Sequence, residues 1–146
     1  MKYISRTKDG VVSLVAYEEY LALARHELIA RVDGAGLLET RRFGLAGPET
    51  FHDARLDRLR VVSGVDGGGE MRAFIRLRGP YFDRSFELEY RSVVRLDGNI
   101  PAADTDLIVH ELRVEGGLLV HELAFDKDKK IEIVCGGLHF REQIPE

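Results

Sequence analysis

Residues 107–125 read LIVHELRVEGGLLVHELAF, and this stretch decides the fold. Its first six residues recur in nearly the same order 11 positions later, and Gly116 and Gly117 lie between the two copies. Paired glycines between two alternating segments are typical of a two-residue β-hairpin turn. The turn predicts three cross-strand pairs: Glu115 with Leu118, Leu112 with His121, and His110 with Leu123.

This register divides the hairpin into an apolar face and a charged face, because successive side chains of a strand point to opposite sides. The apolar face is predicted to carry Ile108, His110, Leu112, Val114, Leu119, His121, Leu123 and Phe125. The charged face carries Glu111, Arg113, Glu122 and Asp126, and we expect water to cover it. The hairpin thus predicts a sheet with one buried side and one wet side.

The same alternation on both sides of the hairpin predicts further strands. In all, six strands are expected, at residues 53–63, 71–78, 85–96, 105–115, 118–126 and 130–141. Strong turn signals separate them: Asp66-Gly67-Gly68-Gly69, Gly79-Pro80 and Asp97-Gly98-Asn99. Leu56 is out of phase with the next apolar residues, which predicts a bulge near Asp57. Gly136-Gly137 is expected to interrupt the last strand.

One amphipathic helix is predicted at residues 16–32, before the strands. Its apolar stripe comprises Tyr17, Tyr20, Leu21, Ala24, Leu28 and Val32. Asp33-Gly34 is expected to end it, because glycine accepts the left-handed conformation that closes a helix. Residues 34–50 are rich in glycine and predict an irregular connection. A connection of this length is often functional, so we expect it to form the edge of a site.

Together these elements predict a single α+β domain over residues 1–146. Its sheet is antiparallel and meander-like, with about six strands, and the N-terminal helix packs on one face. The short connections favour antiparallel neighbours, because a parallel crossover needs a dozen residues or more. Residues 2–5 are expected to add an edge strand.

Composition narrows the classes of function. The net charge of −4 offers no broad positive surface for a nucleic acid, so none is predicted as a partner. A single cysteine allows no internal disulfide, and no apolar run has the length of a signal peptide or a membrane span. We therefore expect a cytoplasmic protein that does not bind a membrane. No catalytic motif or cofactor fingerprint is present, which favours a protein that is not an enzyme and holds no cofactor.

The sharpest candidate for a site is the pair His110 and His121. Both are predicted on the apolar face, close enough to share a small ligand or a metal ion, since neutral imidazole is a common metal ligand. His52, Asp53 or Cys135 could supply a third ligand. The competing interpretation is that both histidines are core residues whose ring nitrogens bond to protein groups. No close-spaced ligand motif accompanies them, which favours that interpretation.

His52 and Asp53 form the second candidate for ligand binding. Adjacent side chains diverge on an extended chain, so the two residues do not make a catalytic dyad by themselves. The alternative is structural: Asp53 bonds to its own backbone at a turn, and His52 packs at the end of the sheet. A nucleophilic role for Cys135 is not expected, because burial in an apolar strand makes a thiol inert.

The segment Phe51-His52-Asp53-Ala54-x-Leu56-x-x-Leu59, followed by alternating strands, resembles a group of small bacterial domains. The group includes immunity proteins of polymorphic toxin systems, and the resemblance spans residues 51–141. It implies a protein that binds another protein without catalysis, and it implies that His52 and Asp53 stabilise the start of the sheet. The resemblance therefore implies another protein as the partner. A second copy of this chain is also an expected partner, because a sheet with only one helix leaves an edge or a face uncovered.

Overall fold

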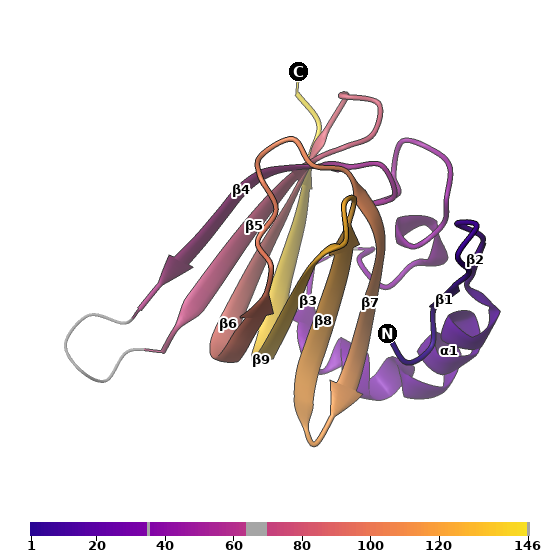
Figure 1. Ribbon diagram of the computed structural model, residues 1–146. Helices are drawn as coiled ribbons and strands as arrows, with labels where there is room; N and C mark the ends of the chain where they lie inside the picture. The colour runs from indigo at the N-terminus through magenta and orange to yellow at the C-terminus, as the bar shows by residue number, and fades with distance from the viewer. Residues whose placement is uncertain (35, 64–69, 146) are drawn as a thin grey trace.

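The computed structural model describes residues 1–34, 36–63 and 70–145, and it has the predicted α+β fold. Within these ranges the elements follow in the order β1 (Ser5–Arg6), β2 (Val12–Ser13), α1 (Val15–Ile29), β3 (Val32–Asp33), a 3₁₀ turn η1 (Thr40–Arg42), β4 (Arg55–Val62), β5 (Arg72–Arg78), β6 (Ser85–Gly98), β7 (Leu107–Glu115), β8 (Leu118–Phe125) and β9 (Lys129–Gln143). No helix among the described residues combines the length and the apolar character needed to cross a membrane. The single α-helix of this part of the chain packs against a large sheet (Figure 1).

The six predicted strands are present and form two three-stranded antiparallel meanders. The order in the sheet is β4-β5-β6-β9-β8-β7, so the two meanders join where β6 pairs with β9. β3 adds a short parallel pair to β9, which brings the described sheet to seven strands. The predicted bulge in the first meander is confirmed, since the register of β4 shifts between Leu56 and Arg58.

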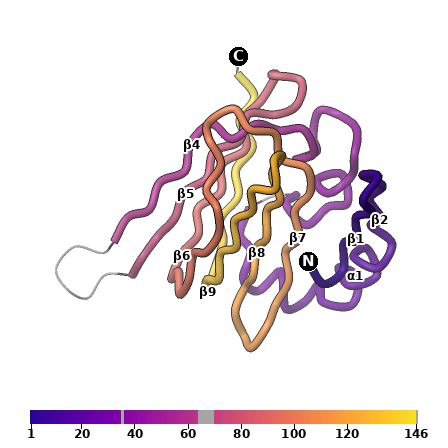
Figure 2. Tube along the Cα trace, in the orientation of Figure 1, coloured from indigo at the N-terminus to yellow at the C-terminus, as the bar shows by residue number. Residues whose placement is uncertain are grey.

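The sheet curves so strongly that its two outer strands meet at one end. Figure 2 shows the connection after β6 passing beside β4 before the chain enters β7. Four backbone hydrogen bonds join this junction: Asp53 N–H to Leu107 O (2.8 Å), Leu107 N–H to Ala54 O (2.7 Å), Leu56 N–H to Thr105 O (3.0 Å) and Asp104 N–H to Leu56 O (2.7 Å). The start of β4 is thereby paired on both sides, whereas the rest of β4 is not.

The predicted hairpin register is confirmed at all three pairs: Glu115 with Leu118, Leu112 with His121, and His110 with Leu123. Its apolar face lies against the core, as expected. The largest fully buried apolar side chains of the molecule are Tyr17, Tyr90, Phe51, Phe86, Phe125 and Phe140. Aromatic side chains therefore fill much of the space inside the curved sheet.

The expectation of a wet charged face on the hairpin holds for Asp126, which is exposed, but is wrong for the other three residues. Glu111, Arg113 and Glu122 are all buried, because residues 1–4 lie across this face of β7 and β8. The Glu111 carboxylate accepts hydrogen bonds from the backbone N–H groups of residues 2, 3 and 4, at 2.7–3.0 Å. The Arg113 guanidinium lies 2.8 Å from the Glu111 carboxylate and 2.6 Å from that of Glu122. The alternation of the sequence predicted that these charged side chains face solvent. They are buried because residues 1–4, which are distant in the sequence, cover them.

The helix is shorter than predicted, and Gly34 has a different role. α1 ends at Ile29, and Val32 pairs with Leu138 in β3 instead of extending the helical stripe. Gly34 has φ +120°, and a Cβ atom there would overlap the carbonyl oxygen of Phe140. Glycine is required because the backbone of this segment lies against β9, and not because it closes the helix.

Two further expectations need correction, and one lies outside the described residues. β9 continues through Gly136-Gly137, because β6 pairs with it on both sides of the glycines and β3 takes over from β8 at the other edge. The alternation nevertheless changes phase there, from buried Ile133 and Cys135 to buried Leu138 and Phe140. Residues 2–5 add no strand to the large sheet; β1 and β2 pair only with each other. The predicted turn at Asp66-Gly67-Gly68-Gly69 lies outside the described residues.

Side chains from other elements bond to the outer edge of β7. The Tyr17 hydroxyl accepts from Leu112 N–H at 2.7 Å and donates to Leu112 O at 2.6 Å. The Tyr20 hydroxyl accepts from Val114 N–H at 2.7 Å. An edge strand with unpaired backbone groups invites pairing with other chains. α1 therefore satisfies and shields this edge as well as covering apolar surface.

Replacement of Tyr17 by phenylalanine is expected to lower the free energy of unfolding by about 2 kcal/mol, because it leaves a buried N–H and a buried C=O of Leu112 without a partner. Chemical denaturation measures the loss, and the Leu112 amide should exchange faster with deuterium. Tyr81→Phe is the matched control: its hydroxyl is on an exposed side chain, and a change below about 0.5 kcal/mol is expected. Equal effects of the two substitutions would contradict the role given to the Tyr17 hydroxyl.

Candidate functional site

His110 and His121 lie together inside the molecule, as the hairpin register predicts. His110 Nδ1 is 3.0 Å from His121 Nε2, and the two rings meet nearly edge to face. The remaining ring nitrogens also have partners: His110 Nε2 is 3.0 Å from the carbonyl oxygen of Arg42, and His121 Nδ1 is 2.7 Å from the Tyr90 hydroxyl. All four ring nitrogens are thus engaged with protein groups.

The carbonyl oxygen of Arg42 determines the direction of all the hydrogen bonds in this chain, because it can only accept. A carbonyl oxygen only accepts, so His110 Nε2 carries a proton and donates to Arg42. A neutral His110 then accepts at Nδ1, which requires His121 Nε2 to donate. His121 Nδ1 consequently accepts from the Tyr90 hydroxyl. The chain runs in one direction, from Tyr90 through both histidines to the backbone of η1.

Burial keeps both imidazoles neutral. It lowers the pKa of His110 from its ordinary 6.5 to about 4, although the bond to Arg42 opposes this effect. Burial and the neighbouring His110 lower the pKa of His121 well below its ordinary value. Burial likewise raises the pKa of the Tyr90 hydroxyl well above 10 and that of the Cys135 thiol to about 11. None of these groups changes its charge near neutral pH. The cluster is therefore an uncharged, hydrogen-bonded part of the core.

The glycine-rich connection, predicted as the edge of a site, packs directly on His110. The Phe43 and Phe51 rings stack on the His110 ring, with centroids at 4.2 and 4.5 Å. Arg42 is fully buried; its guanidinium bonds to Glu142 at 2.8 Å and lies 5.1 Å from the centroid of the Phe140 ring. His110 therefore attaches the connection to the sheet.

His52 and Asp53 lie near the β4–β7 junction and not with the histidine pair. His52 Nδ1 donates to Ile108 O at 2.6 Å, which satisfies another outward-facing carbonyl of the β7 edge. Asp53 is exposed, has φ +64°, and bonds through its backbone N–H to Leu107 O. Its carboxylate lies 3.5 Å from His52 Nε2. The two residues contact each other and the start of the sheet, but they share no site with His110 and His121.

Cys135, the other third ligand considered, is buried on β9 opposite Leu119. Among residues 1–34, 36–63 and 70–145, no three His, Cys, Asp or Glu side chains are placed to hold one metal ion. Metal binding at the histidine pair would have to break hydrogen bonds that the ring nitrogens already make. That hypothesis stays a prediction of the sequence.

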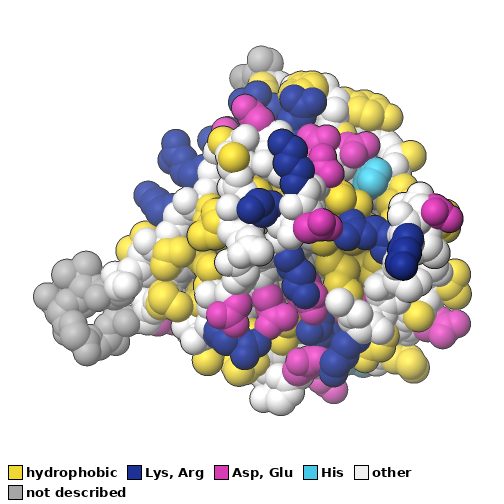
Figure 3. All heavy atoms as spheres, in the orientation of Figure 1, with side chains coloured by type: hydrophobic (Ala, Val, Ile, Leu, Met, Phe, Trp, Pro, Cys, Tyr) yellow, Lys and Arg dark blue, Asp and Glu magenta, His cyan; other side chains and the backbone are white. Residues whose placement is uncertain are grey.

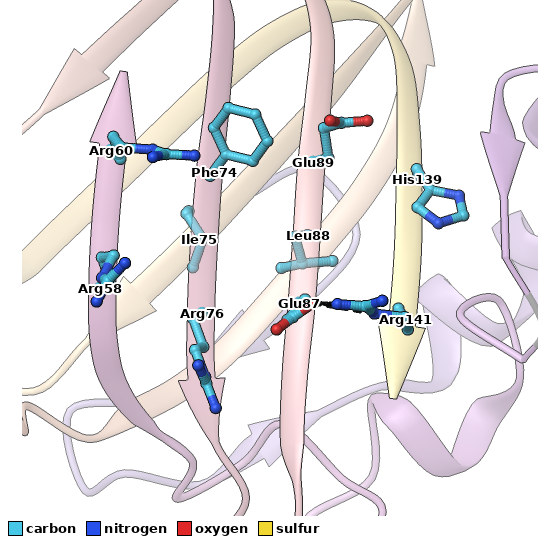
Figure 4. A pocket seen from close by; sticks show the side chains of 10 residues that line it. All are labelled: Arg58, Arg60, Phe74, Ile75, Arg76, Glu87, Leu88, Glu89, His139 and Arg141. Atoms are coloured by element: carbon cyan, nitrogen blue, oxygen red, sulfur yellow. Dashed lines mark hydrogen bonds and ion pairs between the residues drawn. The ribbon is translucent and has the colours of Figure 1, made fainter. Parts of the chain in front are cut away.

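The structure also contains a second candidate site, on the outer face of the sheet. The sequence does not predict it, because the charged residues there indicate only a solvated strand face. The outer surface of β4, β5, β6 and β9 contains a hollow of about 370 Å³. Two cross-strand rows of side chains line it (Figure 4): Arg58, Arg76, Glu87 and Arg141 in one, and Arg60, Phe74, Glu89 and His139 in the other. The alternation placed the β4–β6 residues on one face, but nothing in it shows that β9 completes the surface.

Ion pairs order the β6–β9 side of this hollow. Arg141 pairs with Glu87, and the Arg91 guanidinium lies 2.7 Å from Glu89. His139 Nδ1 lies 3.2 Å from the Asp33 carboxylate. On the β4 side the Arg60 guanidinium lies 4.7 Å from the centroid of the Phe74 ring. Figure 4 shows the Arg60 side chain extending toward this ring. The hollow therefore combines fixed charges with an aromatic ring on a rigid sheet, which suits recognition of another molecule.

No protein-family model, no curated protein and no solved structure matches this chain.

Proposed function

We propose that this chain is a non-enzymatic, cytoplasmic protein-binding module whose binding surface is the outer face of β4, β5, β6 and β9. The observation that carries this proposal is the hollow of about 370 Å³ on this face, with Phe74 between Arg60 and Glu89. Arginine and aromatic side chains are the residues that most often dominate the binding energy of protein interfaces. The remaining ion pairs supply a polar rim.

The contrast between the two halves of the outer face of the sheet supports this choice. Residues 1–4 cover the outer face of β7 and β8, and α1 bonds to the edge of β7. In the described part of the chain, no element covers the two cross-strand rows of the hollow in the way that residues 1–4 cover β7 and β8. A partner would therefore find this half of the sheet open.

The placement of the titratable groups supports a role without catalysis. Burial shifts the pKa of Tyr90, His121 and His110, and all three side chains are closed off from solvent. The carboxylates on the hollow, Glu87 and Glu89, lie in ion pairs with arginine. A general acid or base also needs access to a substrate, and Tyr90, His110 and His121 lack that access in the core.

An immunity-like role, in which the partner is a toxin, is the specific form of this proposal that the sequence resemblance implies. Homodimer formation stays a prediction. Binding of a small ligand or metal at His110 and His121 is the alternative function; it has less support, because every ring nitrogen there already has a protein partner.

Site-specific crosslinking tests the proposed surface. A photoreactive phenylalanine analogue in place of Phe74, expressed in the source cells, is expected to capture one protein reproducibly, because the ring lies in the hollow. The same analogue at Leu23, an 88% exposed residue of α1, is the matched control and should not capture it. The captured protein, identified by mass spectrometry and purified, should bind the wild-type chain and lose at least tenfold in affinity for Phe74→Asp. Capture from Leu23 alone, or from neither position, would contradict the proposal.

A further inference from the structure

Most of β4 has a free backbone edge. At its start Leu56 bonds to residues 104 and 105, but for residues 58–62 the described chain provides no backbone partner on the side away from β5. Alternate residues of an edge strand direct their N–H and C=O groups outward, where a further strand can bind them. The β7 edge is bonded to tyrosine and histidine side chains, so β4 is the open edge of the described sheet.

The side chains along this edge are strongly basic. Arg58 and Arg60 are exposed on the outer face, and neither forms an ion pair with any described residue. The carboxylate of Asp57, which precedes Arg58 in the sequence, already pairs with Arg76 of the neighbouring strand at 3.3 Å. Figure 3 shows Lys and Arg side chains projecting on the β4 side of the molecule. Arg58 and Arg60 are therefore available to form ion pairs with carboxylates of a partner.

These charges argue against a second copy of the chain as the strand that binds here. Two β4 strands paired antiparallel would bring Arg58 and Arg60 of one copy against the same residues of the other. Like charges placed opposite each other on a sheet are destabilising, and charged edge strands are a common device against self-pairing. A strand with acidic side chains would instead be attracted, because its carboxylates could pair with both arginines.

We infer that the partner binds through an extended acidic segment, which pairs with β4 as an additional strand and places its carboxylates against Arg58 and Arg60. This inference rests on the proposed function, because it concerns the same outer face. Backbone hydrogen bonds along the edge supply affinity, and the alternating carboxylates supply specificity. The two arginines stand two residues apart on β4, which matches carboxylates at alternate positions of a partner strand.

The test uses the purified full chain and a synthetic octapeptide of alternating Glu and Thr with blocked ends. Titration followed by NMR is expected to shift amide signals of β4 and to protect amides of residues 58–62 from exchange. Arg58→Glu/Arg60→Glu should weaken binding at least tenfold, and a Lys–Thr peptide should bind this variant at least tenfold better than the wild type. Arg25→Glu, on the exposed side of α1, makes the same charge reversal at one position away from β4 and should leave the affinity unchanged.

Three outcomes would overturn the inference. A Glu–Thr peptide that is N-methylated at alternate residues should bind at least tenfold more weakly; equal binding would mean charge attraction without strand pairing. Absence of binding by the Glu–Thr peptide, or shifts outside β4 and β5, would reject the acidic strand. Tighter binding of a ten-nucleotide oligo(dT) would identify the face as a nucleic-acid surface.

If the Phe74 crosslink succeeds while the peptide fails, the proposed function stands and only the acidic strand is rejected. If the Phe74 crosslink fails, the proposed function falls whatever the peptide does.

Discussion

Replacement of Glu111 by alanine is expected to lower the free energy of unfolding by about 3–5 kcal/mol, the range for breaking a buried ion pair. The Glu111 carboxylate is fully buried and accepts hydrogen bonds from three backbone N–H groups of residues 2–4. It also pairs with Arg113, itself a buried cation. The substitution leaves these donors without their acceptor, and only Glu122 and the partly exposed Glu115 then balance Arg113. An effect of this size is a large part of the stability of an ordinary domain.

Chemical denaturation measures this loss, and Glu132→Ala is the matched control. Glu132 faces Glu122 across β8 and β9, but its carboxylate pairs with Arg95 at a partly exposed position. Exposed pairs contribute at most about 1 kcal/mol, so the control should change little. The amides of residues 2–4 should exchange faster with deuterium in Glu111→Ala than in Glu132→Ala. Equal losses in both variants would show that the Glu111 cluster contributes no more than a surface pair.

Acidification from pH 7.5 to 4.5 is expected to remove about 2–3 kcal/mol of stability through His110 alone. Burial places the pKa of His110 at about 4 in the folded chain, against 6.5 when unfolded. Between these values the unfolded chain binds a proton that the folded chain excludes. The stabilisation is therefore present above pH 6.5 and is lost progressively as the pH falls from 6.5 to about 4. His121 acts in the same direction, since burial also lowers its pKa.

His110→Gln separates this effect from those of other groups. Glutamine does not titrate, so the difference in unfolding free energy between pH 7.5 and 4.5 should shrink by about 2–3 kcal/mol, whatever the stability at pH 7.5. Carboxylates with a lowered pKa, such as Glu142 beside Arg42, lose their stabilisation mainly below their ordinary value of 4.5. Denaturation midpoints at steps between pH 4.5 and 7.5 therefore report on histidine. His26→Gln, on the exposed side of α1, is the control, and a pH dependence unchanged in His110→Gln would contradict neutral burial.

The parts of the fold that follow from local patterns could be predicted. The hairpin of residues 107–125 was placed in its correct register, because paired glycines and alternating side chains act over a few residues. The same holds for the bulge after Leu56 and for the helical stripe from Tyr17 to Leu28. The proximity of His110 and His121 followed from the register alone, whereas binding of a ligand by them did not.

The rest depends on contacts between distant segments, which no local pattern contains. The pairing of β6 with β9 joins residues 85–98 to residues 131–143, and it creates the outer hollow. Residues 1–4 bury Glu111, whose position in the alternation predicted exposure. Arg42, in a glycine-rich connection, proves to be a buried anchor for His110.

The sequence by itself determined which residues alternate, where the chain turns, and that one helix precedes an antiparallel sheet, because these depend on backbone geometry over a few residues. Only the tertiary structure decided which strands became neighbours, which charged face lost its water, and which edge stayed open. The physical reason is that burial and the electrostatic environment of a side chain are set by whichever distant segment packs over it.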